Sequence, residues 1–145
     1  MTYPILVFVH IIAATIWTGG HLILAIRFLP KALKKNNFSI IENFEKAYEP
    51  IGLPALLTLV ITGLWLAFIR LPNFSDWLTF QEHFPKHILL KLFLLFTTLA
   101  LAIHARFFLI PKKKLKPLAI HIVLVTLVAV LFVLVGVSLR TGLLF

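Results

Sequence analysis

Six histidines stand out in a chain otherwise dominated by apolar residues. Five of them lie inside or at the ends of long hydrophobic stretches: His10, His21, His87, His104 and His121. An ionisable side chain inside a membrane segment is costly, so it is a functional hypothesis by default. Any single histidine could serve only as an interhelical hydrogen-bond partner, but five in so short a chain favour a shared chemical role. Neutral imidazole is a ligand for haem iron, Cu(II) and zinc.

Two of these histidines are predicted to share one face of the first helix. His10 and His21 are eleven residues apart, which places their side chains within about 20° of each other around a regular helix. Trp17 falls on the same stripe. Along the axis the two imidazoles are separated by ~16 Å, which is half of a hydrocarbon core. One helix therefore presents an outer and an inner imidazole.

Counting residues from the helix ends sorts the histidines by depth. His10 and His87 form an outer group, and His21 and His104 form an inner group to which His121 is a substitute member. Facing helices in bundles build cofactor sites from such inward side chains. We therefore expect two stacked bis-histidine sites for b-type haem, with His10 and His87 as ligands of one and His21 and His104 as ligands of the other.

Haem propionates require cationic partners, and the sequence offers several. Lys91 lies one turn deeper than His87 on the same helix face, in an otherwise apolar run, and is a candidate on the outer side. Arg106 is a candidate on the inner side. Arg27 and Arg140 are better explained as anchors that extend to the membrane interface.

Several chemistries are excluded by what the sequence lacks. It contains no cysteine, and its only methionine is Met1, which excludes disulfides, zinc–thiolate centres and soft ligation of Cu(I). No glycine-rich phosphate loop, nucleophile elbow or paired carboxylate is present, so hydrolysis and phosphoryl transfer have no support. Catalytic residues stay unassigned, and a haem-dependent membrane oxidoreductase is the one enzyme class left open.

The elements that must position the histidines are four apolar stretches. The chain is 61% hydrophobic and 13% charged, and each stretch approaches the ~20 residues that cross a bilayer. Backbone polar groups cannot stay unpaired in lipid, so the stretches must be helices. We expect a single all-α transmembrane domain over residues 1–145, a four-helix up-down bundle with helices at about 4–29, 50–69, 87–110 and 118–139. No internal repeat is recognised.

Charge predicts the orientation of this bundle. Of 14 Lys and Arg residues, most lie in the two loops that follow the first and third helices. By the positive-inside rule these loops face the cytoplasm, which places both termini outside, most simply in a bacterial inner membrane. The basic residues flank membrane segments, so we expect a lipid bilayer as the partner and no nucleic acid. The outer loop over residues 73–83 has room for a short interfacial helix anchored by Trp77.

Short motifs along the chain resemble the copper-resistance-D (CopD) family. They are His10 with Trp17-Thr18-Gly19-Gly20-His21 and Phe28-Leu29-Pro30, then Thr62-Gly63, His87-Ile88-Leu89-Leu90-Lys91, His104-Ala105-Arg106 and Gly136-Val137-Ser138-Leu139-Arg140. This resemblance implies copper handling in the membrane. The plan is also similar to the HemJ type of protoporphyrinogen oxidase, which implies b-type haem, with His10 and His104 at positions resembling that group's histidines. The sequence departs from the HemJ pattern after Trp17.

Three functions follow as hypotheses. The first is a haem b membrane protein, with one or two haems per chain, that moves electrons between a quinone-level donor and an unidentified redox partner. The alternative is a copper-binding or copper-uptake protein that uses the same histidines as a transfer path. The third is a structural subunit whose histidines only join helices. Whether the chain forms a homo-oligomer is left open.

Overall fold

Four long helices make up the chain, as the four apolar stretches predict. The computed structural model describes residues 1–80 and 82–144. Its elements are α1 (Thr2–Ile23), the π-helical η1 (Leu24–Phe28), α2 (Leu29–Lys35), α3 (Phe38–Arg70), the 3₁₀-helical η2 (Phe74–Leu78), α4 (His83–His104), the π-helical η3 (Ala105–Leu109) and α5 (Leu115–Thr141). No strand occurs in the described residues, so the expected all-α class is confirmed.

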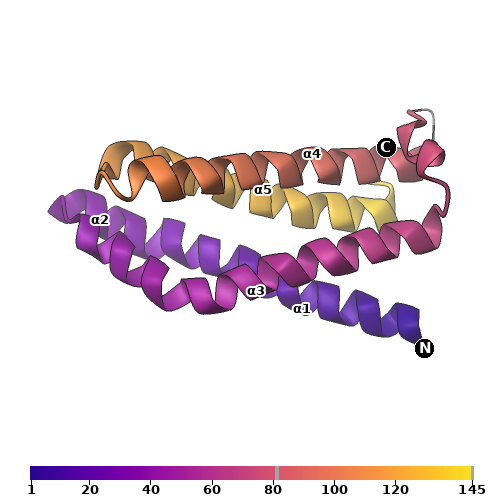
Figure 1. Cartoon of the computed structure of the whole chain (residues 1–145), viewed down its shortest axis with the longest axis horizontal. Coiled ribbons are helices and arrows are strands. Elements are labelled where there is room, and N and C mark those ends of the chain that lie inside the picture. Colours follow the sequence, from indigo (N-terminus) through magenta and orange to yellow (C-terminus); the bar gives the residue numbers. More distant parts are fainter. Residues whose placement is uncertain (81, 145) are drawn as a thin grey trace.

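The helices run side by side as an elongated up-down bundle (Figure 1). The closest packing joins α1 to α3 and to α5, and α4 to α5. Four apolar segments, Thr2–Lys35, Phe38–Arg70, His83–Leu109 and Leu115–Thr141, are each long and apolar enough to cross a membrane. Phe8, Phe96 and Phe107 are among the many large apolar side chains on the outer surface, each at least 64% exposed. Such a surface is suited to lipid rather than water.

The second spanning helix begins well before the predicted boundary. We expected it over residues 50–69, but α3 begins at Phe38, and Pro50 and Pro54 both lie inside it. Asn37 caps its first turn by accepting a hydrogen bond from the Ser39 N–H at 3.0 Å. This early part alternates charged and apolar residues, so its mean hydropathy is low although Ile41 is fully buried. The apolar stretch in the sequence therefore predicted only the apolar part of α3 and missed the charged part at its beginning.

The third predicted segment also shifts at its start. We expected the third spanning helix from residue 87, but α4 begins at His83 and has Pro85 in its first turn. A proline is tolerated there because the first N–H groups of a helix have no partner within the helix.

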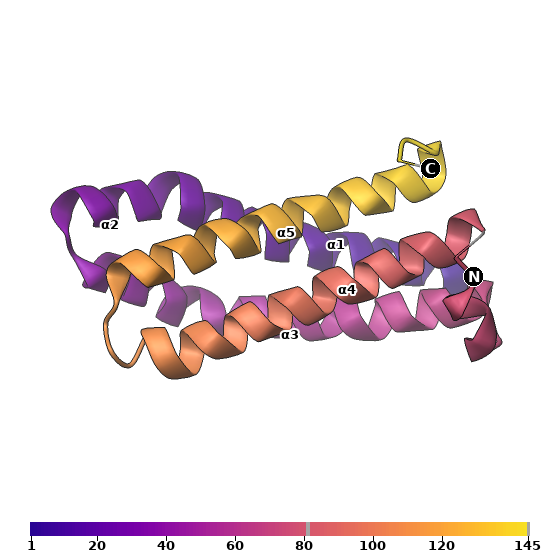
Figure 2. The same ribbon diagram turned by 90° about the horizontal axis from the view of Figure 1, so that it is seen from above.

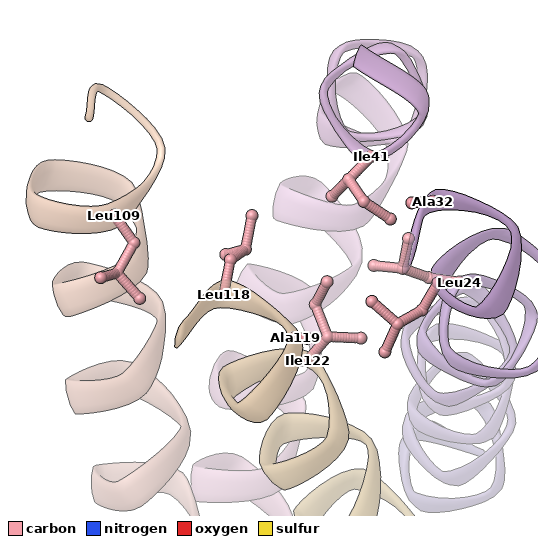
Figure 3. Close-up of a cluster of buried hydrophobic side chains, with 8 residues drawn as sticks. Leu24, Ala32, Ile41, Leu109, Leu118, Ala119 and Ile122 are labelled. Atoms are coloured by element: carbon pink, nitrogen blue, oxygen red, sulfur yellow. The ribbon is translucent and has the colours of Figure 1, made fainter. Parts of the chain in front are cut away.

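One apolar cluster ties all the helices together at one end of the bundle. It contains Leu24, Leu29, Ala32, Ile41, Leu109, Leu118, Ala119 and Ile122, and seven of these are labelled in Figure 3. Leu24 belongs to η1 and Leu109 to η3, so both π-helical segments contribute to the cluster. The rotation of each helix about its axis is thereby fixed at this end.

Both lysine-rich connections lie at this same end. α2 and the turn to α3 lie beside the turn that joins η3 to α5, while the two termini and η2 lie at the opposite end (Figures 1 and 2). Which end faces the cytoplasm stays a prediction from the positive-inside rule.

The orientation can be measured because the native chain has no cysteine. A single cysteine at Lys34 or Lys113 is expected to be shielded from a membrane-impermeant thiol reagent in intact cells, whereas a cysteine at Ser75 is expected to react. All three should react after permeabilisation. Labelling of the two lysine positions from outside would reverse the assigned orientation.

The tryptophan of the outer loop has a different role from the predicted one. The expected short helix is present as η2, but Trp77 is only 2% exposed, so it is not an interfacial anchor. Its indole Nε1–H donates to the Leu71 carbonyl at 2.9 Å, and its ring packs against Phe68 and Phe74. Buried indoles require an N–H acceptor, and the end of α3 supplies one.

Candidate functional site

The outermost histidine of α1 is held by a threonine on α3. His10 Nδ1 lies 2.8 Å from Thr62 Oγ1, and Thr62 Oγ1 donates its own hydrogen to the Thr58 carbonyl at 2.6 Å. A hydroxyl has one hydrogen, so Thr62 must accept from His10. The proton of a neutral His10 therefore resides on Nδ1, and the Nε2 lone pair is left for a ligand.

The second histidine of α1 is held in the same tautomer by its own helix. His21 Nδ1 lies 2.8 Å from the Trp17 carbonyl, which can only accept. The Trp17 and Tyr48 rings flank the imidazole, with ring centroids at 4.3 and 5.9 Å. Nε2 of His21 again keeps its lone pair. Fixing Nδ1–H on a carbonyl or hydroxyl is the usual way in which a protein orients a metal-ligating imidazole.

Tyr48 enters the interface between α1 and α3 at the level of His21. Its hydroxyl donates to the Ile16 carbonyl at 2.9 Å. Its ring occupies the space that a side chain at Gly20 or Gly52 would fill. The two glycines thus make room for Tyr48, and the ring in turn determines how closely the two helices approach beside His21.

The histidine at the start of α4 is tied to α5. His87 is fully buried, and its Nδ1 lies 2.7 Å from the His83 carbonyl. Its Nε2 lies 3.1 Å from Ser138 Oγ, which in turn accepts from the Leu144 N–H at 2.9 Å. His87 therefore donates through Nδ1 and accepts through Nε2, which makes it a connector between α4 and α5.

The last two histidines form a pair on the seam between α4 and α5. His121 Nδ1 donates to the Pro117 carbonyl at 3.0 Å, so its Nε2 accepts from His104 Nδ1 at 2.8 Å. The two rings stack with centroids 4.9 Å apart. His104 is left with an Nε2 lone pair on the exposed side of α4, and His121 acts as its support.

These networks divide the five intramembrane histidines into two classes. In three of them Nδ1 is the hydrogen-bond donor and Nε2 is available as a ligand: His10, His21 and His104. In His87 and His121 both ring nitrogens are in hydrogen bonds. The expected division into an outer and an inner set stays a prediction, as does each pairing. Among the described residues, no group of three or more His, Asp or Glu side chains could hold a metal ion.

The two cations expected near the cofactor have different surroundings. Arg106 of η3 is exposed and forms an ion pair with Glu49 of α3. This ion pair links the two helices near the end of the bundle that carries both lysine-rich connections, which we call the basic end. Lys91 of α4 is half-buried. It takes part in neither of the two ion pairs found among the described residues, Lys46 with Glu42 and Arg106 with Glu49. Its Nζ lies 3.6 Å from the position of a Cβ on Gly136 of α5.

Several residues that build the site were not assigned from the sequence. Thr62 and Ser138 support histidines that are 52 and 51 residues away in the chain. Gly63 allows His10 to approach, since a Cβ there would lie 3.2 Å from His10 Cε1. Thr62 and Gly63 belong to one short motif, and a polar residue beside a glycine in an apolar helix was the available signal.

The fold defines a class: an integral membrane protein of four long helices, with histidines within its membrane-spanning segments. The family model described as Copper resistance protein D (CopD) matches residues 42–142. The chain belongs to this family, as the motifs indicated. The matched region includes His87, His104 and His121 and begins after His10 and His21. No curated protein and no solved structure matches the chain, and the similarity to the HemJ type stays a prediction.

Proposed function

We propose that this protein binds copper within the membrane through histidine imidazoles and passes it between an outer and an inner position in the bundle. The observation that carries the proposal is the tautomer of His10 and His21. Both are anchored through Nδ1–H and present Nε2 from the same helix. Membership of the CopD family supports copper as the metal.

The donor set favours the divalent ion. Cu(I) prefers thiolate and thioether ligands, whereas imidazole suits Cu(II). The chain has no cysteine and only the methionine at position 1. We therefore assign Cu(II) to imidazole ligands, with carbonyl oxygens or water completing the coordination.

Two ligand positions at different depths suit stepwise movement. His10 and His21 are separated by ~16 Å along α1, so one ion cannot bind both. An ion that leaves His10 must move inward to reach His21. Movement through an apolar bundle in steps between weak ligands satisfies the requirement that a conducted ion can both enter and leave each site.

Haem b was the first expectation, and the family favours copper instead. Bis-histidine haem at the outer position would need Nε2 of both His10 and His87. Because His87 Nε2 lies against Ser138, that pairing would require the contact to break. Quinone or another redox partner, an oxidoreductase activity and a homo-oligomer stay predictions. We place the protein in a bacterial inner membrane with both termini outside, on the strength of its charge distribution.

A copper titration of the purified protein in lipid nanodiscs tests the proposal. We expect stoichiometric binding of Cu(II), an electron paramagnetic resonance spectrum with nitrogen hyperfine splitting from imidazole, and no absorption in the haem Soret region. Stoichiometric binding should be lost when His10 and His21 are both replaced by glutamine. A red protein with a Soret band and no Cu(II) binding would overturn copper in favour of haem.

A further inference from the structure

Most of the positive charge of the chain lies at the basic end of the bundle (Figures 1 and 2). This end holds ten of the 14 Lys and Arg residues and three of the five acids, and so a net charge of +7. Two of these acids are already paired, Glu42 with Lys46 and Glu49 with Arg106. Eight bases then remain against Glu45 alone, and seven of them are lysines of the two connections.

The two lysine groups are held beside each other by the apolar cluster of Figure 3. Ala32 of α2 belongs to the same buried cluster as Leu109 and Leu118, which lie on either side of the second connection in the chain. The lysines around Ala32 are exposed, and so are those at residues 112–114 and 116. Because one cluster anchors both connections, their charges form one surface rather than two.

Both connections turn through the same backbone motif. In each of them the N–H groups of a left-handed residue and of the next residue bond back to carbonyls of the preceding helix. The left-handed residue is Asn36 (φ 47°) in the first turn and Lys113 (φ 50°) in the second. Glycine or asparagine is favoured at such a position, and a lysine there has a steric cost. The fold alone does not explain Lys113, and its charge gives a reason for it.

Large apolar side chains are exposed beside each lysine group. Ile26 and Leu33 are 72% and 44% exposed, and Phe107 and Phe108 of η3 are 68% and 54% exposed. In a membrane such side chains contact acyl chains, while lysines extend to the headgroups. A soluble anion would contact only the lysines. A phospholipid would contact the lysines through its phosphate and the apolar side chains through its acyl chains.

We infer that the basic end is a binding surface for anionic phospholipids. Their phosphate oxygens accept hydrogen bonds from the lysines of α2 and of the turn between η3 and α5, and their acyl chains lie against the exposed apolar side chains beside these lysines. Clusters of about four to eight Lys and Arg residues next to a spanning helix are typical of sites for acidic headgroups. The inference does not depend on the proposed copper function, since it uses none of the histidines.

Native mass spectrometry of the full chain in detergent, titrated with phosphatidylglycerol or phosphatidylcholine, tests this surface. Both lipids carry a phosphate, but only the first has a net negative charge, and we expect it to bind at least about tenfold more tightly. The doubles Lys34→Gln/Lys35→Gln and Lys112→Gln/Lys114→Gln should each remove most of that preference. The double Arg70→Gln/Arg140→Gln removes two exposed cations at the opposite end and should leave the preference unchanged.

Lys113→Asn separates the charge of this lysine from its part in the fold. It introduces the residue that the first turn has at the same position, so the variant should unfold at or above the native temperature in phosphatidylcholine nanodiscs. Its affinity for phosphatidylglycerol should fall about fivefold, and Lys113→Arg should keep the native affinity. Equal binding of the two lipids by the native protein, or an unchanged preference in both lysine doubles, would overturn the inference. Displacement of phosphatidylglycerol by inorganic phosphate would also overturn it, because the surface would then bind the anion without the lipid.

Discussion

Replacing His10 by glutamine is expected to abolish the outer copper site, with a loss of affinity of more than about 100-fold, while the bundle stays folded. In the proposed function His10 Nε2 is the ligand of this site, and glutamine supplies no imidazole lone pair. The residue is half-buried and its hydrogen bond to Thr62 is one of many interhelical contacts. Binding is measured by Cu(II) titration in nanodiscs, and folding by circular dichroism and thermal unfolding.

Removing the hydrogen-bond partner of His10 should lower the copper affinity by less than removing His10 itself. In Thr62→Val the imidazole loses the acceptor that holds its proton on Nδ1. Removing such an outer partner typically weakens metal binding by ~10–100-fold. An affinity equal to that of the native protein would show that the tautomer of His10 is not fixed by Thr62.

His87→Ala is the control for a histidine that we expect to stabilise the fold without ligating copper. His87 accepts from Ser138 and is fully buried, so its loss leaves the Ser138 hydroxyl and the His83 carbonyl with one partner fewer. Leaving buried polar groups unsatisfied costs about 1–3 kcal/mol each. We expect this variant to unfold at a lower temperature and to bind copper at the outer site normally. Loss of copper from His87→Ala, with the fold intact, would instead support the original pairing of His10 with His87.

The second large effect concerns two adjacent glycines. Gly20→Leu is expected to destabilise the bundle by about 1–3 kcal/mol through overpacking, because a side chain at residue 20 would overlap the ring of Tyr48. α1 and α3 would have to separate beside His21, and the Tyr48 hydrogen bond to Ile16 would be lost as well. Gly19→Leu is the control, since nothing lies within 4 Å of a Cβ at that position.

The comparison is made by thermal unfolding of both variants in the same lipid. Gly19→Leu should unfold close to the native temperature, and Gly20→Leu well below it. Tyr48→Phe, which keeps the ring and removes the hydroxyl, should cost about 1 kcal/mol. Equal destabilisation by the two leucines would mean that both positions face the same environment, contrary to the placement of Tyr48.

Hydropathy was sufficient to predict the number of spanning helices and their class because lipid imposes the helix on any long apolar stretch. It could not locate the beginning of α3, where Glu42 and Lys46 reduce the hydropathy of a helix whose Ile41 is buried. Periodicity correctly identified residues on one stripe of α1. Which histidines on different helices face one another depends on how each helix is rotated about its axis. That rotation cannot be read from the sequence of a single helix.

The histidines illustrate the same limit. Six candidates could be found by residue type alone, yet their ligand capacity depends on the partner of Nδ1. Pro117, Trp17 and Thr62 hold three imidazoles in one tautomer. Ser138 gives His87 a second contact, and a serine near the end of an apolar helix carries no sign of that role.

The π-helical segments have a consequence for how the two ends of the bundle relate. η1 begins three residues after His21, and η3 begins directly after His104. A π turn contains about one residue more than an α turn, so everything beyond it is rotated by ~100° relative to a regular helix. In these two helices, the side chains before the π segment and those after it therefore follow different rotational positions around the helix axis. The extra residue in each segment changes the direction of the lysine-bearing turn without changing the direction of the histidines before it.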